Sequence, residues 1–367
     1  MITIIGGGPA GIGMGVLLKQ NGIDDFIILE RDQVGSTFFQ WPEETRFITP
    51  SFTAHGFSYL DLNAILPDTS PAYTFGKEHL SGEEYGEYLC MIAEHYKLPV
   101  SENTQVHKVE KREEKKYWVQ TSEKGDGFFS NSVIIACGEF QFPKRPFKYG
   151  IHYGDVTSWK EIEGDRIIIG GGESAADAAY HLNKEGRKVD VYYSAKQWFD
   201  IEVDPSRTLS PFTRERLEST KALNGIFEHP MSRAISVEKD DEKDMFLIQF
   251  ENGDVVETKW EPIICTGFGS GAKQFKELFE WNEEGLPILT EKDESTQAPS
   301  VYLIGPNVRQ SNTIFCFIYK FRQRFAIIAE DIFFHHNLPR NQEVFEMYKK
   351  SAMYLDDLSC CEKGCAC

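Results

Sequence analysis

The sequence predicts an α/β protein made of two Rossmann-like dinucleotide-binding domains, the second inserted in the first, with antiparallel strand meanders attached. Three observations lead to this prediction. Residues 1–30 read as a strand, a glycine turn, a helix and a second strand that ends on an acid. Residues 166–196 repeat that pattern 164 positions later. The apolar stretch 301–305 supplies a late strand for the first domain, so the repeat is enclosed as an insertion.

The first glycine turn follows directly from a short apolar strand, residues 2–5, and has the pattern Gly-x-Gly-x-x-Gly. Gly6 permits the tight turn, Gly8 lets the backbone approach a pyrophosphate, and Gly11 lets the next helix pack on the strand. The N-terminus of that helix offers unpaired N–H groups to phosphates. Glu30 ends the second strand, where its carboxylate can accept hydrogen bonds from a ribose. With this context the pattern predicts a dinucleotide site rather than a plain glycine-rich turn.

The connection that follows, residues 32–71, carries turn residues and many aromatic side chains but little periodicity. So long a connection is either functional or disordered, and the aromatic residues argue against disorder. We therefore expect a packed loop over a planar ligand. Further along, the pattern predicts a helix, a small strand meander and an apolar strand, which are residues 81–96, 104–109 with 117–121, and 132–136.

The second glycine turn keeps the first two glycines of the pattern and replaces the third with alanine. Gly6, Gly8 and Gly11 correspond to Gly170, Gly172 and Ala175. Where the first unit has its acid, the second has Ser194, with Lys196 close by. A carboxylate would repel a 2′-phosphate, whereas a hydroxyl and a lysine accommodate one. We therefore favour NADPH over NADH, although Lys196 can also be read as a solvated strand end.

After the second unit, residues 198–228 are polar and are expected to be mostly loop or helix. A second meander, a buried strand and a long helix complete the chain. They are residues 235–238, 246–250 and 255–258 for the meander, 262–265 for the strand, and a helix capped by Ser311 or Asn312 that reaches about His335. Prolines and turn residues place the crossings, so we expect one domain at 1–145 and 296–367, with a cysteine-rich tail at 358–367, and the other at 146–295.

Composition describes an ordinary globular protein of 367 residues, with 41% hydrophobic and 26% charged residues. The net charge of -18 argues against nucleic acid or an anionic membrane surface as a partner. No apolar run approaches the roughly 18 residues of a spanning helix, and the first strand begins at residue 2, so we expect a cytoplasmic protein without a targeting segment. The expected partner is a small-molecule substrate, and a homodimer is one assembly the chain could form.

Several motifs together resemble the two-dinucleotide-binding-domain flavoproteins of the pyridine nucleotide-disulfide oxidoreductase superfamily. They are the two glycine turns, Ala136-Cys137-Gly138, Cys265-Thr266-Gly267 and Leu303-Ile304-Gly305. Within this group the chain is most similar to the flavin-containing monooxygenases. Val34-Gly35-Ser36-Thr37-Phe38 resembles their flavin-side Gly-Gly-Thr-Trp loop, and Thr266-Gly267-Phe268 resembles their Thr-Gly-Tyr. The resemblance covers nearly the whole chain.

Two departures from that family bear on the reaction. Phe147, Gly150 and His152 match residue types of the monooxygenase fingerprint but not its spacing. Gly305 is followed by Pro306-Asn307, where the superfamily normally has an acid that holds the ribityl chain. We expect Asn307 or backbone amides to take that role.

The resemblance implies FAD and NADPH as cofactors. NADPH would reduce the flavin, and the reduced flavin would use dioxygen to oxygenate a small sulfur or nitrogen nucleophile or a ketone. The motifs and the resemblance place the FAD site at Gly6, Gly8, Pro9, Ala10, Gly11, Glu30, Arg31, Ser36, Thr37, Phe38, Trp41, Val106, Ala136, Cys137, Gly138, Gly305 and Asn307. They place the NADP site at Gly170, Gly172, Glu173, Ser174, Ala175, Ser194, Lys196, Thr266 and Gly267.

Two residues are candidates for the catalytic site. Trp41, with Phe38, would form part of the flavin-facing wall, although aromatic residues in such a loop are equally often core packing. His152 would steer the nicotinamide domain, or else be a hydrogen-bonded histidine between domains. The catalytic residues are otherwise unknown.

A thiol or disulfide reductase on the same scaffold is the main alternative. Such enzymes usually pass electrons through a cysteine pair beside the flavin, and no such pair occurs near either glycine turn. The end of the chain, however, resembles the vicinal cysteine tail of mercuric reductase. A soft metal ion or a redox relay could use these thiols, which are Cys360, Cys361, Cys365 and Cys367. A disordered tail and a non-catalytic nucleotide sensor are the remaining interpretations.

Overall fold

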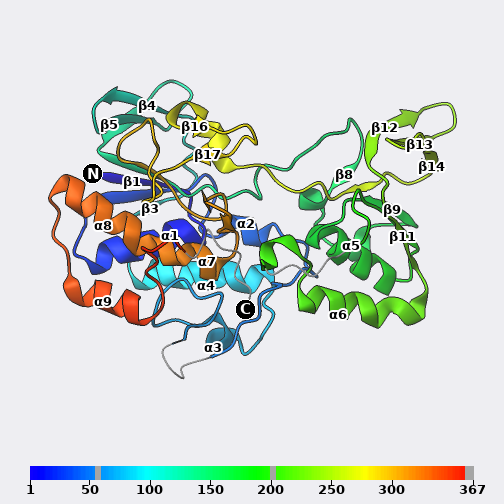
Figure 1. Ribbon diagram of the computed structural model, residues 1–367, viewed down its shortest axis with the longest axis horizontal. Helices are drawn as coiled ribbons and strands as arrows, with labels where there is room; N and C mark the ends of the chain where they lie inside the picture. The colour runs from blue at the N-terminus through cyan, green and yellow to red at the C-terminus, as the bar shows by residue number, and fades with distance from the viewer. Residues whose placement is uncertain (54–58, 199–203, 360–367) are drawn as a thin grey trace. The chain divides into compact units, whose positions relative to one another are not determined.

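The computed structural model describes residues 1–53, 59–198 and 204–359 (Figure 1). The chain forms two compact units. Of the described residues, the first unit contains those within 1–39, 49–141 and 270–359, and the second those within 40–48 and 142–269. Each unit is built on a five-stranded sheet whose strands are all parallel. None of the helices described is both long and apolar enough to cross a membrane.

The sheet of the first unit has the order β18-β7-β1-β2-β3. Its strands are β1 (Ile2–Ile5), β2 (Phe26–Leu29), β3 (Val100–Ser101), β7 (Ser132–Ile135) and β18 (Val301–Leu303). The late strand pairs with β7, so the first unit closes only after the second has been inserted. Helix α1 (Pro9–Gln20) follows β1, and the absent side chain of Gly13 lets Phe325 of α8 (Phe325–His336) pack against it.

The remaining elements of the first unit are short apart from one helix. They are α2 (Ser36–Phe39), α3 (Pro71–Phe75), α4 (Gly82–His95), the antiparallel strands β4 (Lys108–Glu113), β5 (Lys116–Gln120) and β6 (Gly127–Ser130), the hairpins β16 (Glu280–Trp281) with β17 (Pro287–Ile288) and β19 (Arg309–Gln310) with β20 (Thr313–Ile314), α7 (Ile318–Phe321) and α9 (Gln342–Lys350). A capping box formed by Ser81 and Glu84 begins α4, because each side chain accepts the other's backbone N–H.

The sheet of the second unit has the order β11-β10-β9-β15-β8. Its strands are β8 (Ile151–His152), β9 (Arg166–Ile169), β10 (Val189–Tyr192), β11 (Ile226–His229) and β15 (Ile263–Ile264). Helix α5 (Glu173–Lys184) packs on one face of this sheet through four buried alanines and a leucine. The other face packs on a meander, which is β12 (Ala234–Asp240), β13 (Met245–Phe250) and β14 (Val255–Thr258). Helix α6 (Pro211–Thr220) contacts α5.

Most predicted elements are confirmed, and the largest error concerns the last long helix. The structure has a hairpin, β19 with β20, where Ser311 and Asn312 were expected to cap a helix. Ser311 adopts a positive φ of 49° in the turn of that hairpin. The helical region begins instead at Ile318 and passes through a 3₁₀ turn before α8. Strand β11 was also missed, because its region is polar and lacks a clear period of two.

The unit boundaries differ from those expected at 145/146 and 295/296. The chain passes into the second unit after Gln141 and leaves it after Gly269, and residues 40–48 also belong to the second unit. The stretch after Gly269 packs in the first unit early. Gly271 N–H donates to Gly138 O at 2.9 Å, and Gln274 Nε2 donates to Val106 O at 2.6 Å.

Candidate functional site

The first glycine turn has the geometry that a bound dinucleotide phosphate requires. Gly6 has a φ of 115°, and a Cβ there would lie 2.5 Å from the carbonyl oxygen of Ala136. A Cβ on Gly11 would lie 1.9 Å from the carbonyl oxygen of Gly6. By contrast, a Cβ on Gly8, at the start of α1, would meet no atom within 4 Å. The turn is therefore closed where strand and helix meet and open in front of the helix N-terminus, which fits a pyrophosphate.

Glu30 lies beside this turn. Its Oε2 accepts the N–H of Gly7 at 2.6 Å, and its Oε1 accepts the N–H of Asp32 at 3.0 Å. The hydroxyl of Ser36 is 3.4 Å from Oε1. These contacts hold the carboxylate at the end of β2, the position at which an adenosine ribose is bound in this class of fold.

Three strand ends of the first unit bring the other predicted FAD residues together. Asn307 is buried, and its Nδ2 donates to Gly138 O at 2.8 Å. A Cβ on Gly305, which has a φ of 100°, would be 3.5 Å from the Cβ of Ala10. Burial raises the pKa of the Cys137 thiol to about 12, so this thiol is protonated at neutral pH. The structure therefore brings these residues together, with the amide of Asn307 in the place where an acid was expected.

The predicted flavin wall is divided between the two units. Phe38 is buried in the first unit, with its ring edge-on to Tyr85 at a centroid distance of 4.8 Å. Trp41 lies in the segment 40–48 of the second unit, with its ring 5.0 Å from that of Phe47. Arg31 and Thr37 both lie near Gln141, which accepts from the Arg31 guanidinium at 2.5 Å and is 3.5 Å from the Thr37 hydroxyl. Val106 is buried.

The second glycine turn repeats the geometry of the first. Gly170 has a φ of 144°, and a Cβ there would lie 2.3 Å from the carbonyl oxygen of Cys265. A Cβ on Gly172 would meet nothing within 4 Å, and Ala175 is fully buried. Ser194 and Lys196 follow β10 and are exposed. Their side chains are therefore accessible to a 2′-phosphate.

His152 organises the strand ends of the second unit. It is buried, its Nε2 donates to Gly267 O at 3.1 Å, and its Nδ1 accepts the N–H of Gly154 at 3.1 Å. Burial lowers the pKa of His152, which favours the neutral ring that these two contacts require. Thr266 donates to Lys144 O at 2.7 Å. The predicted residues His152, Thr266 and Gly267 are thus brought together, with both nitrogens of the ring engaged.

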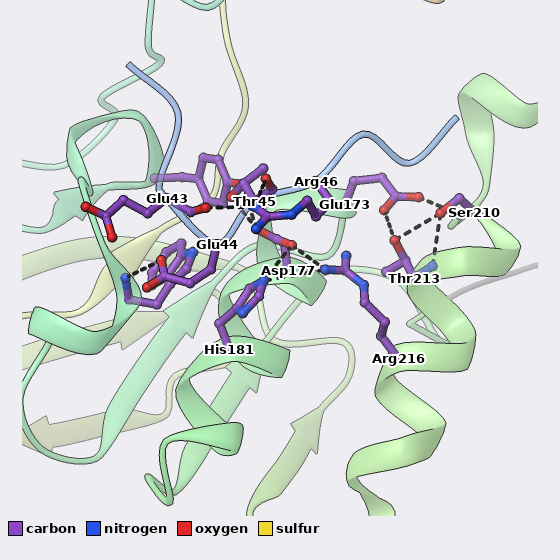
Figure 2. A network of polar contacts seen from close by, with 12 residues as sticks. Glu43, Glu44, Thr45, Arg46, Glu173, Asp177, His181, Ser210, Thr213 and Arg216 are labelled. Atoms are coloured by element: carbon purple, nitrogen blue, oxygen red, sulfur yellow. Dashed lines mark hydrogen bonds and ion pairs between the residues drawn. The ribbon is translucent and has the colours of Figure 1, made fainter. Parts of the chain in front are cut away.

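A polar network along one face of α5 was not predicted (Figure 2). Asp177 is buried and accepts from the Thr45 hydroxyl and the Tyr153 hydroxyl, both at 2.8 Å, and from Arg216 at 2.9 Å. Although burial opposes ionisation, His181, Arg216 and Thr45 lower the pKa of Asp177 to about 2. Asp177 is therefore ionised and joins three other segments of the second unit to α5.

Glu173, the first residue of α5, joins this helix to the start of α6. Its carboxylate accepts the N–H of Ser210 and the hydroxyl of Thr213, both at 2.5 Å. Burial raises its pKa. Glu173, Asp177 and His181 recur every four residues on one helix face, and this spacing is the only signal of the network in the sequence.

Thiols and a carboxylate cluster were also considered as reactive groups. In the described ranges, the thiols of Cys90, Cys137 and Cys265 form no disulfide. The predicted metal or redox residues Cys360, Cys361, Cys365 and Cys367 lie outside the described residues. Glu294, Asp331 and His335 bring their ligand atoms within 4.8 Å of one another. Tyr302 donates to Asp331, and Lys115 lies beside His335, so hydrogen bonds account for this cluster.

Comparison with known proteins agrees with this geometry. The chain is 27% identical over 212 residues to an uncharacterised CzcO-like oxidoreductase of Geobacillus kaustophilus, covering 55% of this chain and 57% of that protein. It is 27% identical over 229 residues to a Baeyer-Villiger monooxygenase of Pseudomonas aeruginosa, covering 59% of this chain and 41% of that protein. The matches thus span about half the length of these two relatives.

A solved structure shows the same fold over nearly the whole chain. The bacillithiol disulfide reductase Bdr (YpdA) of Staphylococcus aureus superposes with a TM-score of 0.72 at 21% identity, covering 91% of this chain and 98% of that chain. The family described as pyridine nucleotide-disulphide oxidoreductase matches residues 3–305. Together with the two glycine turns, this match makes the protein a flavoprotein oxidoreductase that uses FAD and NADPH. The chain belongs to the pyridine nucleotide-disulphide oxidoreductase family.

Proposed function

We propose that the protein is a monooxygenase that transfers one oxygen atom from dioxygen to a small sulfur or nitrogen nucleophile or to a ketone. In this reaction NADPH, a proton, dioxygen and the substrate give NADP⁺, water and the oxygenated product. The observation that supports it is the state of three of the described thiols. Burial raises the pKa of Cys90, Cys137 and Cys265, so none of these three is the activated thiolate that a dithiol relay needs.

When bound, FAD accepts a hydride from NADPH and reacts with dioxygen, and the chain supplies binding, orientation and exclusion of water. Gly8 and the N-terminus of α1 would hold the FAD pyrophosphate, with Glu30 on the ribose. Gly172 and the N-terminus of α5 would hold the NADPH pyrophosphate, with Ser194 and Lys196 on the 2′-phosphate. His152 would keep the strand end at Gly267 in place as a positioning residue.

The second candidate is an NADPH-dependent flavoprotein reductase of a thiol, a disulfide or a soft metal ion. Two observations favour it. The Staphylococcus structure is that of a disulfide reductase, and four cysteines lie within the last eight residues of the sequence. In this reading NADPH supplies two electrons through the flavin, and the terminal thiols carry the disulfide or the metal ion to be reduced.

One set of measurements on the FAD-loaded protein separates the two candidates. With NADPH and ¹⁸O₂, we expect a thioether, a tertiary amine or a ketone probe to gain one labelled oxygen atom for each NADPH consumed. A variant that lacks residues 360–367 should retain this reaction.

The reductase predicts the opposite pattern. NADPH consumption would proceed without dioxygen, follow the amount of added disulfide or Hg²⁺, and disappear in the variant that lacks residues 360–367. That result, with no labelled product from any probe, would contradict the monooxygenase.

A further inference from the structure

The segment Gln40–Ile48 belongs to the second unit although it follows the flavin-side loop in the chain. We propose that this segment forms part of the NADPH site and that Arg46 binds the pyrophosphate of the nucleotide. Thr45, anchored on Asp177, would be the positioning residue that presents Arg46. The inference rests on the NADPH dependence that both candidate reactions share.

The segment is fixed to the second unit by contacts that leave it little freedom. Thr45 is buried, and its hydroxyl lies 2.8 Å from Asp177 and 2.9 Å from the Tyr153 hydroxyl. Glu44 accepts the Ser158 hydroxyl at 2.7 Å and the N–H of Trp159 at 3.0 Å. Arg46 directly follows these two anchored residues, so its backbone is held in one place.

The guanidinium of Arg46 is only partly used by the protein. Its Nη1 donates to the carbonyl oxygens of Glu43 at 2.7 Å and Thr45 at 2.8 Å. Its Nε and Nη2 make no hydrogen bond to a described residue, and no described carboxylate forms an ion pair with it. Two other arginines of the same unit do have such partners, since Arg145 pairs with Asp155 and Arg216 with Asp177. A half-buried guanidinium with free donors is suited to an anionic ligand.

The place of Arg46 indicates which anion. Arg46 directly follows Thr45, whose hydroxyl is hydrogen-bonded to Asp177 in the second turn of α5, and Figure 2 draws these residues next to the start of that helix at Glu173. Gly172 precedes that residue and leaves open space at the same end of the helix. The N-terminus of the helix after a glycine turn is the pyrophosphate subsite of a dinucleotide. Arg46 would add a positive charge and a planar pair of donors to the backbone N–H groups there.

The 2′-phosphate is expected elsewhere in the unit, after β10, where Ser194 and Lys196 lie. This separation gives the proposal a specific signature. NAD⁺ and NADP⁺ share the pyrophosphate and differ only at the 2′-position. Loss of the Arg46 side chain should therefore raise the dissociation constants of both nucleotides by the same factor. Loss of the Lys196 side chain should raise that of NADP⁺ alone.

The test is calorimetric titration of the FAD-loaded protein with NADP⁺ and with NAD⁺. We expect Arg46→Gln to raise both dissociation constants about ten- to a hundredfold, with their ratio unchanged, the range for a charged hydrogen bond. Arg46→Lys should weaken binding less than Arg46→Gln does, because lysine keeps the positive charge but lacks the planar pair of guanidinium donors. Lys196→Gln should raise the dissociation constant of NADP⁺ relative to that of NAD⁺. Lys243→Gln, in the exposed turn between β12 and β13, is the matched loss of a positive charge and should change neither constant.

Variants of Thr45 provide an independent test of the proposal. Thr45→Val removes only the hydroxyl that reaches Asp177 and should weaken both nucleotides, whereas Thr45→Ser should bind like the parent protein. Thermal unfolding confirms that each variant is folded. The proposal is overturned if folded Arg46→Gln binds both nucleotides as the parent does, or weakens NADP⁺ alone. These are equilibrium measurements, so absence of oxygenated product does not affect them, whereas failure of the parent protein to bind NADP⁺ would reject the proposed function itself.

Discussion

At the scale of single residues, Asp177 is a buried carboxylate that accepts hydrogen bonds from several segments of the second unit. Its carboxylate is buried, yet it is surrounded by donors from Thr45, Tyr153 and Arg216, which come from three other segments. Such a group stabilises the fold only while it is ionised and its partners are present. The residue therefore links the stability of the second unit to pH.

We expect Asp177→Asn to lower the free energy of unfolding by about 3–5 kcal/mol, because Arg216 loses its buried partner. The pKa of Asp177 is about 2, below its ordinary 3.8. Its contribution is therefore complete above about pH 4 and is lost as the pH falls toward 2. Between pH 5 and pH 2 the parent protein should lose about 2 kcal/mol more than the variant in urea unfolding.

Asp241→Asn, at an exposed position of the second unit, serves as the control for this change. It should alter the free energy of unfolding by no more than about 0.5 kcal/mol. If Asp177→Asn were equally mild, or had the same pH dependence as the parent protein, the ionised state of Asp177 would be refuted.

At the scale of elements, two glycines of the second turn have different roles. One is required by the backbone, and the other leaves space for a ligand. Gly170 is required by the backbone, because its φ is 144° and a Cβ would collide with a carbonyl oxygen. Gly172 has an ordinary φ of -97° and open space beside it, so nothing in the folded chain requires a glycine there. The space in front of α5 is instead explained by the nucleotide that must approach the helix.

We therefore expect Gly172→Ala to leave the melting temperature unchanged while it weakens NADP⁺ binding about tenfold or more, because the methyl group occupies the space of a charged hydrogen-bonded phosphate. Gly170→Ala should instead destabilise the fold by about 1–3 kcal/mol. Thermal unfolding and calorimetric titration of the two variants measure the difference. Equal effects on melting temperature would show that the two glycines do not have separate roles.

For the whole molecule, the question is how the last described residues are held, because the cysteine-rich end follows them in the chain. Residues near the described end are tied to α8 and the preceding 3₁₀ turn. Leu355 O accepts from Arg324 Nη1 at 2.5 Å, and Tyr354 donates to Glu330. These hydrogen bonds are made between residues that precede Cys360.

Removal of residues 360–367 should change the free energy of unfolding by less than about 0.5 kcal/mol. FAD content and NADP⁺ affinity should also be unchanged. Chemical denaturation, flavin absorbance and titration test this. A loss of FAD on truncation would mean that the terminal cysteines support the flavin unit directly.

The strand expected at 104–109 begins only at Lys108, but local sequence patterns correctly predicted the glycine turns, the repeated unit, the meander of the second unit and helix α4 with its Ser81–Glu84 cap. Each of these depends on neighbours in the chain, namely on period, turn chemistry and capping. The same reasoning placed a cap at Ser311 or Asn312, where the chain forms a hairpin instead. Local capping signals also occur in tight turns, and only the surrounding packing distinguishes the two.

The contacts between segments that are distant in the chain are visible only in the tertiary structure. Arg324 is buried in the 3₁₀ turn before α8, and its Nε pairs with buried Asp293 at 2.7 Å. Arg322 likewise donates to the carbonyl oxygens of Asp61 and Ala64. Thr45 and Asp177 are 132 residues apart, and nothing local to either one indicates the other. The two glycine turns follow from the sequence alone, because each depends only on residues that are close together in the chain. The contacts that support the second turn follow from folding, because burial and pairing bring together groups that are far apart in the chain.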